Sequence, residues 1–584
     1  MNTKHTFVLT TLASAMMTVF AAGAAEDDEY EVDLTPLISF ESNLSVGIGH
    51  FNGDREQFGM FDGVRGSESV LMLDGDVRMR DDETGTWTTA TFRNLGLDSQ
   101  EATVGYEQQG DWGIQLHYNQ MPRYAPYTVN TGLIGIGSDS LIVSNPSITP
   151  GSGNDVVPGT QREIVGIYFH KYLMPRLSLK VDFKNEEKDG TRHWGRGGQP
   201  EFMIEPIDWT TRQMEMSLNY AGKKFQMAGG YYGSWYTNAN TLVDTIRAGD
   251  DPLVLANHIY LSQPLDNQAH QIFVDGGYSF TPTMRGSFKA SYTHATQDEY
   301  IPTAGIAGLA DPAAPSSLDG EVNTTMMQLG ITARPLPDLN LVANLRYNDV
   351  DDKTPAWLVV TGGTQVHSTP LSYETLSAKL EGIYRLTDRY SVIAGIDQKN
   401  QDRDVPFGGD INPVDGLDDE RYVPFRTELD ETTYRVQLRR SLSDTLNGSL
   451  AYLHSERDGT VYSDAIHSLG GINPINISDR DRDKWRLTLD WMATDRINLQ
   501  FNFEDAKDDY GPDSNPYGLF EGKARMYSID ADYSISNKWQ VTAWVSHDDT
   551  EAEQFGGRWD RITEDHEVDK YSELKDEGDS VGMG

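Results

Sequence analysis

Apolar and polar residues alternate one by one in many short stretches of this chain. The pattern runs without an exception through residues 177–184, 485–491 and 497–504. Successive side chains of a β-strand point to opposite faces, so strict alternation predicts strands with one apolar and one polar face. In residues 527–535 one face holds tyrosine, isoleucine and alanine, and the other holds serine and aspartate.

Short turn signals separate successive strands and recur roughly every 40 to 60 residues, which suits two strands and one long loop per repeat. They are Met174-Pro175-Arg176, Ala221-Gly222-Lys223, Thr281-Pro282-Thr283, 335–338, Thr387-Asp388, Ser443-Asp444, Thr494-Asp495 and Ser536-Asn537. The other connections are long and rich in glycine, proline and aspartate, at about 123–161, 188–207, 238–265, 299–319, 351–371, 404–425, 459–481, 511–522 and 551–566. Short turns at one end and long loops at the other are typical of outer-membrane β-barrels.

The polar faces of the predicted strands carry many charged side chains. They include Lys180, Asp182, Lys184, Arg435, Arg439, Asp490, Asp530 and Asp532. In a soluble sandwich the apolar face would pack on a second sheet, whereas in a barrel it faces lipid and the polar face lines a watery lumen. Charged inner faces and segregated loop lengths favour the barrel over a soluble exported β-protein.

The strands number about 21 or 22, which predicts an all-β fold, a large antiparallel transmembrane β-barrel of more than 20 strands. The first clear strand lies at about 44–52, so the segment ahead of it is too short for the plug domain of a TonB-dependent transporter. The lumen is then open, occluded by its own loops, or occupied by another protein. Residues 579–584 read as the first half of a strand, which predicts that the C-terminal strands are missing.

The N-terminus has the pattern of an export signal. Lys4 and His5 precede an apolar run over residues 7–22, and Ala22-Gly23-Ala24 forms a small-residue cleavage site. We therefore expect a signal peptide at residues 1–24, a short periplasmic N-terminal segment at 25–43 and the transmembrane β-barrel at 44–584. This organisation predicts a location in the outer membrane of a Gram-negative bacterium.

The composition is compatible with a barrel and narrows the chemistry. The 11 Trp, 28 Tyr and 20 Phe residues suit aromatic girdles at the two membrane interfaces. A formal net charge of −41 disfavours nucleic acid as a partner. Cysteine is absent from the 584 residues, so the chain has no disulfide, no thiolate metal site and no C-x-x-C-H haem attachment.

No constellation typical of catalysis, cofactor binding or metal binding stands out, so we predict no such site residues and no enzyme activity. His50, His117, His170 and His193 are scattered along the chain, and Asp479, Asp481 and Asp483 alternate with Arg480 and Arg482. Other acidic groups are Asp418-Asp419-Glu420 and Asp508-Asp509. The remaining short motifs are the glycines Gly132, Gly135 and Gly137 and the sequon Asn447-Gly448-Ser449. A lumen-facing histidine could act as a distal haem ligand, but a solvated strand residue is the favoured interpretation. The acidic groups lack the spacing of an EF-hand, and the glycines lack a strand–helix context.

The N-terminal third contains an ordered series of short motifs: Val46-Gly47-Ile48-Gly49, 58–63 (FGMFDG), 80–87 (RDDETGTW), Asn94-Leu95-Gly96-Leu97 and Gln109-Gly110-Asp111-Trp112. This order and spacing resembles the MtrB/PioB family of decahaem-associated outer-membrane β-barrel proteins. Some family members carry a Cys-x-x-Cys near the mature N-terminus, and this chain has no cysteine. Any role tied to that motif is therefore not carried over.

The resemblance implies a porin-like barrel that sheathes a periplasmic multihaem c-type cytochrome inserted in its lumen. A second, extracellular multihaem cytochrome usually docks outside, and electrons cross the outer membrane. Haem c is then expected on the partner and none on this chain. The alternative function is a large plugless porin or a polysaccharide export channel.

Overall fold

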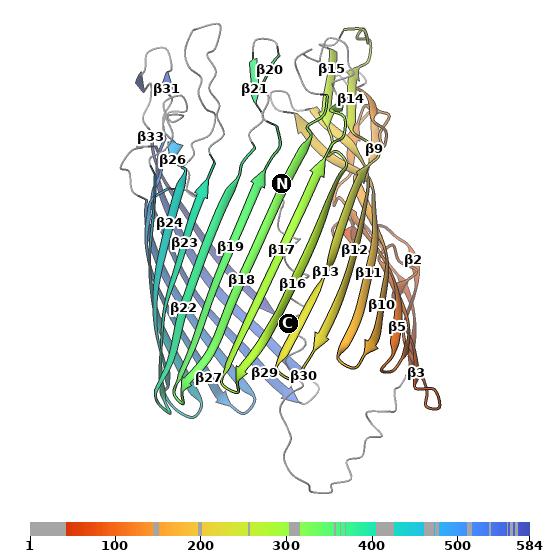
Figure 1. Cartoon of the computed structure of the whole chain (residues 1–584). Coiled ribbons are helices and arrows are strands. Elements are labelled where there is room, and N and C mark those ends of the chain that lie inside the picture. The colour runs from red at the N-terminus through yellow and green to blue at the C-terminus, as the bar shows by residue number, and fades with distance from the viewer. Residues whose placement is uncertain are drawn as a thin grey trace.

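The computed structural model describes residues 42–143, 151–196, 201–254, 257–302, 316–355, 358–361, 364–367, 370–404, 426–460, 472–473, 478–510, 517–536, 539–556, 559–560, 565–566 and 570–584. Its main element is an antiparallel sheet of 22 strands that curves into the wall of a wide barrel (Figure 1). The predicted fold class and strand number are confirmed. The predicted signal peptide, most of the N-terminal segment and residues 418–420 lie outside the described residues.

The wall strands follow one another in chain order. They are β1 (Asn43–His50), β2 (Ser69–Asp81), β3 (Thr86–Leu95), β4 (Gln100–Gln108), β5 (Trp112–Tyr124), β10 (Gly159–Met174), β11 (Leu177–Arg196), β12 (Glu201–Ala221), β13 (Phe225–Asn238), β16 (Asn267–Thr281), β17 (Met284–Gln297), β18 (Gly320–Leu336), β19 (Leu339–Asp352), β22 (Tyr373–Thr387), β23 (Tyr390–Arg403), β24 (Glu428–Ser441), β25 (Leu446–Gly459), β27 (Arg480–Thr494), β28 (Ile497–Asp509), β29 (Tyr517–Ser536), β30 (Trp539–Gly556) and β33 (Lys570–Met583). In the described part of the chain, β1 and β33 are the two end strands of this wall.

The remaining elements are short and belong to the long connections. They are β6 (Val129–Thr131), β7 (Leu133–Ile134), β8 (Ser140–Val143), β9 (Asn154–Val156), β14 (Leu242–Arg247), β15 (His258–Ser262), β20 (Leu358–Thr361), β21 (Thr364–His367), β26 (Ile472–Asn473), β31 (Trp559–Asp560), β32 (Asp565–His566) and the single-turn 3-10 helix η1 (Phe58–Met60). Most rise above the wall at the end opposite the short turns (Figure 1). The predicted separation of short turns from long loops is thus confirmed. No helix in the described residues is long and apolar enough to span a membrane.

The alternation seen in the sequence becomes the two faces of the wall. Across the pair β11–β12, Val181 lies opposite Met216 and Asp182 lies opposite Glu215. Because directly opposed residues in an antiparallel pair point to the same side, apolar residues share one face and charged residues share the other. The apolar face is the outer one. Phe183 and Met216 on this face are 36% and 42% exposed, respectively. Side chains that contact lipid in the membrane are exposed when the chain is considered by itself.

Two local predictions are wrong. Residues 188–207 were expected to form a loop, but most of them extend β11 and β12, which are paired from Leu177–Tyr220 to Arg196–Glu201. The extension has a packing reason, since Met203, Ile204 and Ile207 on this part of β12 are buried. Residues 579–584 were read as the start of a strand. Instead, residues 579–583 are the last part of β33, which spans 14 residues and pairs with β30.

Candidate functional site: the lumen wall and its rim

The outer face of the wall changes from apolar to charged at one level. On the outer face of β25 to β29, Tyr452 packs against Trp485 at 4.7 Å between ring centroids, and Phe503 packs against Tyr527 at 5.2 Å. One position further toward the loops, Arg525 Nε donates to Asp505 Oδ1 at 2.8 Å. These rings form one aromatic girdle of the kind found at a membrane interface, with ion pairs beyond it in water.

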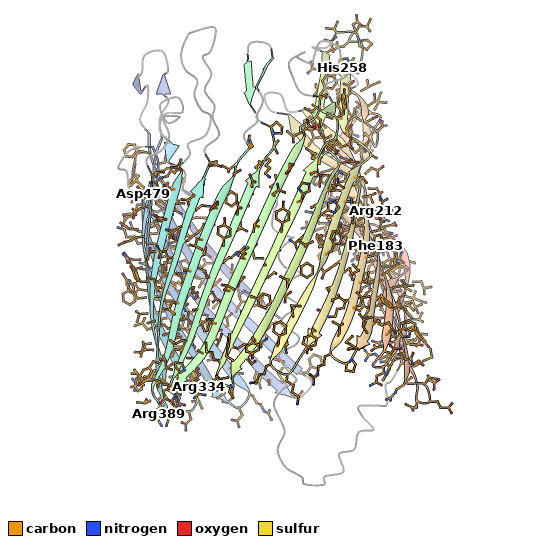
Figure 2. All side chains as sticks on the ribbon, viewed as in Figure 1. Phe183, Arg212, His258, Arg334, Arg389 and Asp479 are labelled. Carbon is orange, nitrogen blue, oxygen red and sulfur yellow. The ribbon has the colours of Figure 1, made fainter. Side chains whose placement is uncertain are left out.

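A second set of outward rings lies beside the short turns. Tyr278 and Phe280 are in edge contact at 5.0 Å, and Trp539 is 70% exposed. Figure 2 illustrates the banding: Phe183 lies part way up the wall, Arg212 lies above it, and Arg334 and Arg389 lie at the short turns. The two predicted girdles are therefore present, and they bound the part of the wall that contacts lipid.

The inner face of β24, β27 and β28 holds a network of ion pairs. Arg482 makes two hydrogen bonds to Asp508, at 2.5 Å from Nε and 2.6 Å from Nη2. Arg480 lies 2.8 Å from Glu431. Lys484 and Arg486 both pair with a single carboxylate, that of Glu504, and Arg435 pairs with Glu381 of β22. The alternating charges that begin at Asp479 are thus the start of β27, with Arg480 and Arg482 on the lumen side.

The lumen face of the neighbouring strands is acidic. Asp530 and Asp532 on β29, Asp548 on β30 and Asp576 on β33 share this face because they alternate with lipid-facing residues such as Ile529 and Val545. Within the described residues, none of these four carboxylates has a Lys, Arg or His nitrogen within 4.0 Å. The far wall is mixed in sign, with Asp275 on β16 opposite Lys289 on β17.

Two long loops build a compact body on the rim. Strands β7, β8, β14 and β15 form a separate four-stranded sheet, in which β8 and β14 run parallel although they belong to different loops. Leu133, Leu141 and Val243 of this sheet and Ile204 of β12 make a hydrophobic cluster in which no member is more than 3% exposed. Figure 1 shows β14 and β15 standing above the wall on one side of the barrel.

Polar contacts fasten this rim body to the wall. Glu205 of β12 is 3% exposed, accepts a hydrogen bond from Gln263 at 2.7 Å and pairs with Arg192 of β11 at 2.5 Å. Within the body, His258 Nδ1 lies 2.8 Å from Asp244 Oδ1, and the hydrogen bond to Asp244 raises the pKa of His258. In Figure 2 His258 lies at the top of the rim.

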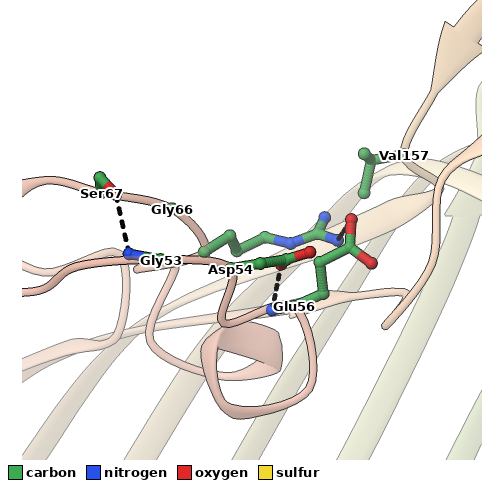
Figure 3. Close-up of a pocket in the computed structure, with 7 residues that line it drawn as sticks. Gly53, Asp54, Glu56, Gly66, Ser67 and Val157 are labelled. Atoms are coloured by element: carbon green, nitrogen blue, oxygen red, sulfur yellow. Dashed lines mark hydrogen bonds and ion pairs between the residues drawn. The ribbon is translucent and has the colours of Figure 1, made fainter.

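A shallow open pocket of about 510 Å³ lies on the rim beside the β1–β2 connection (Figure 3). Its polar groups contact one another. Gly53 N donates to Ser67 Oγ at 2.8 Å, Glu56 N donates to Asp54 Oδ1 at 3.2 Å, and Arg65 lies 3.7 Å from Glu56. The polar groups of the pocket therefore stabilise the loop through contacts with one another and do not converge on a common point where a ligand could bind.

The motif residues in the N-terminal third have structural roles at this rim. A Cβ atom on Gly59 would lie 2.3 Å from the carbonyl oxygen of Val64, and one on Gly96, where φ is +105°, would lie 2.0 Å from that of Leu71. Asp98 N donates to the Asp62 carbonyl at 3.3 Å, so the segments around residues 58–63 and 94–97 meet in space. Their glycines mark close backbone approach and not chemistry.

The histidines are dispersed, as the sequence predicted. His117 bonds Thr103 at 3.0 Å in the lumen wall, and His170 lies 3.9 Å from Glu107. Within the described residues no three His, Asp or Glu side chains gather in a way that could hold a metal ion. What the site offers is a broad polar surface, suited to a partner or to water.

Known proteins resemble this chain in sequence and in fold. A family model described as a putative outer membrane beta-barrel porin, MtrB/PioB, matches residues 50–584. The outer membrane protein MtrB of Shewanella baltica (strain OS185) is 24% identical over 540 residues, which cover 88% of this chain and 73% of that protein.

Two solved barrels share the fold at low identity. The copper transporter OprC matches with a TM-score of 0.50 and 11% identity over 87% of this chain and 74% of that chain. The siderophore receptor PirA from Acinetobacter baumannii matches with a TM-score of 0.50 and 9% identity over 92% of this chain and 78% of that chain. These likenesses concern the barrel alone.

Proposed function

Because the chain belongs to the MtrB/PioB family of outer-membrane β-barrel porins, we propose that its lumen encloses a periplasmic multihaem c-type cytochrome. The pair would carry electrons across the outer membrane. An extracellular multihaem cytochrome is a further partner at the rim. Haem c would reside on these partners, and the barrel would contribute no catalysis of its own.

The width of the wall carries this proposal. Barrels of about 22 strands enclose more space than their own inward side chains fill, and transporters of that size hold a plug domain in the lumen. In the described part of this chain the strands belong to the wall or to short sheets formed by its long connections. A separate protein is therefore a natural occupant.

The chemistry of the inner face suits a protein guest. Charged pairs such as Arg482–Asp508 and Arg480–Glu431 line the wall at its loop end. Polar, hydrated surfaces form interfaces through hydrogen bonds and bridging water, about ten waters per 1,000 Å². The rim body stands above one side of the wall (Figure 1).

The test is co-purification from a host that expresses the chain together with its genomic neighbours. The tagged barrel, solubilised in a mild detergent, should retain c-type haem absorbance in a fixed ratio to barrel protein. The matched control is the same purification from a host without the cytochrome genes. A colourless barrel from the complete host would refute the proposal.

The polar inner wall is also compatible with a second function, that of a large water-filled porin. A separate measurement must distinguish a porin from a cytochrome sheath. Planar-bilayer conductance of the isolated barrel does not separate the two, because an empty sheath also conducts. The discriminating measurement is conductance before and after addition of the purified cytochrome. A sheath closes when it is filled, whereas a porin continues to conduct.

A further inference from the structure

The lumen wall separates its charges by sector. We define the cationic strip as Arg435, Arg439, Arg480, Arg482, Lys484 and Arg486, on the inner face of β24 and β27. These strands flank β25, so the strip occupies one continuous part of the wall. The chain as a whole has a formal net charge of −41, so a basic surface here is a local exception.

The carboxylates near the strip do not neutralise it. Lys484 and Arg486 share Glu504, while Glu381 serves both Arg435 and Lys379. Arg439 is exposed, and no carboxylate within the described residues lies within 4.0 Å of it. Counting Asp490, which faces the bore from β27 nearer the short turn, five carboxylates stand against six basic groups, so a small excess of positive charge faces the bore.

The adjacent sector has the opposite sign. Asp530, Asp532, Asp548 and Asp576 face the bore from β29, β30 and β33, and none has a basic partner within 4.0 Å in the described residues. Only β28 separates the acidic sector from β27. Lipid lies behind the parts of both sectors below the upper girdle, such as Arg486, Asp530 and Asp532. Its low dielectric constant focuses the fields of these groups into the lumen.

We propose that these two sectors fix the rotational orientation of the cytochrome in the bore. The guest would present an acidic patch to the cationic strip and a basic patch to the sector on β29, β30 and β33. This inference rests on the proposed function, and it adds which surface of the guest meets which part of the wall. Complementary potentials across an interface contribute register and exclude wrong arrangements, because like charges in contact cost several kcal/mol.

The test reverses the charge of two residues of the cationic strip whose charges contribute least to the fold. In the double variant Arg439→Glu with Arg486→Glu, Glu504 keeps its contact with Lys484. The matched control is Lys289→Glu, which changes the charge of another inward residue on a different part of the wall. The full chain is co-expressed with its cytochrome, and retained haem per barrel is measured at low and high salt. Heat-dependent gel migration reports folding.

The expected result is a loss of retained haem of about tenfold or more in the double variant at low salt, since close interfacial charge pairs couple by about 1.5 kcal/mol or more. Lys289→Glu should lose much less, and the wild-type complex should weaken as salt rises. If the double variant does not fold, the neutral pair Arg439→Gln with Arg486→Gln serves, with a smaller loss in the same direction.

Three outcomes would overturn the inference. Equal haem retention in the double variant and in Lys289→Glu removes the role of the strip while leaving the proposed function intact. Unchanged haem retention together with a loss of anion selectivity in bilayers would assign the strip to small anions. A wild-type barrel that retains no haem refutes the proposed function, and the orientation of a guest falls with it.

Discussion

Replacing Ala531 with arginine would test the assignment of the two wall faces. On β29 the outward residues run from Ile535 beside the short turn to Tyr527 at the upper girdle, about 27 Å along the strand at 3.4 Å per residue. At a tilt of about 40° this is a height of about 20 Å, comparable with the apolar band of about 25 Å in such barrels. Ala531 lies at its middle, between Leu499 and Ala543 on the flanking strands.

An arginine on the lipid face costs about 2–4 kcal/mol at the midplane and about 0–1 kcal/mol near the interface. Ala531→Arg should therefore lower the free energy of unfolding by about 3 kcal/mol. Tyr527→Arg should lower it by less than about 1 kcal/mol, in addition to the effect of losing the ring contact with Phe503. Ser528→Arg, on the inner face, should change it by about zero. Equilibrium unfolding by denaturant in lipid vesicles gives these values. Equal costs for Ala531→Arg and Ser528→Arg would refute the assignment of faces.

Two further predictions concern the rim body. Ile204→Ala removes a side chain with 0% exposure, so it should lower the local unfolding free energy of the rim body by about 2–5 kcal/mol. Amide hydrogen exchange should therefore become faster in residues 242–247, while the wall strands keep their protection. The raised pKa of His258 means that its contact with Asp244 stabilises the body fully below about pH 6.5, the usual value, and that this stabilisation is lost as pH rises through the raised value. Proteolysis of 242–262 should thus be slower at pH 5.5 than at pH 8.5, and His258→Gln should remove the difference.

The wall could be predicted from the sequence because its rules are local. Alternation over residues 177–184 assigns the faces of β11 directly, since each side chain's orientation depends only on its place in the strand. The short turn at 174–176 separates β10 from β11 where it was expected. Charged residues such as Lys180 and Asp182 identify the watery face without reference to any partner.

The rim body could not be predicted because it depends on contacts between distant segments. β8 and β14 pair in parallel through Leu141 and Thr245, which belong to different loops. Side chains of β8 and β14 pack against Ile204 of β12. This packing stabilises the extension of β12 into a stretch whose glycine, proline and charged residues predict a loop. The sectors of lumen charge were missed for a related reason: Arg435 and Arg486 come to the same part of the inner wall only when β24, β25 and β27 align in register.

The positions of the inward charges constrain what can fill the lumen. Asp530 and Asp532 alternate with Ile529, Ala531 and Tyr533, so carboxylates line the bore at the same height at which lipid covers the outside. An ionised carboxylate needs water, hydrogen bonds or a cation, because its desolvation is far costlier than that of a neutral polar group. A guest with a dry, apolar surface would leave these groups without partners. A guest that carries basic residues would satisfy them, so a protein that fills this lumen would need a hydrated, charged surface.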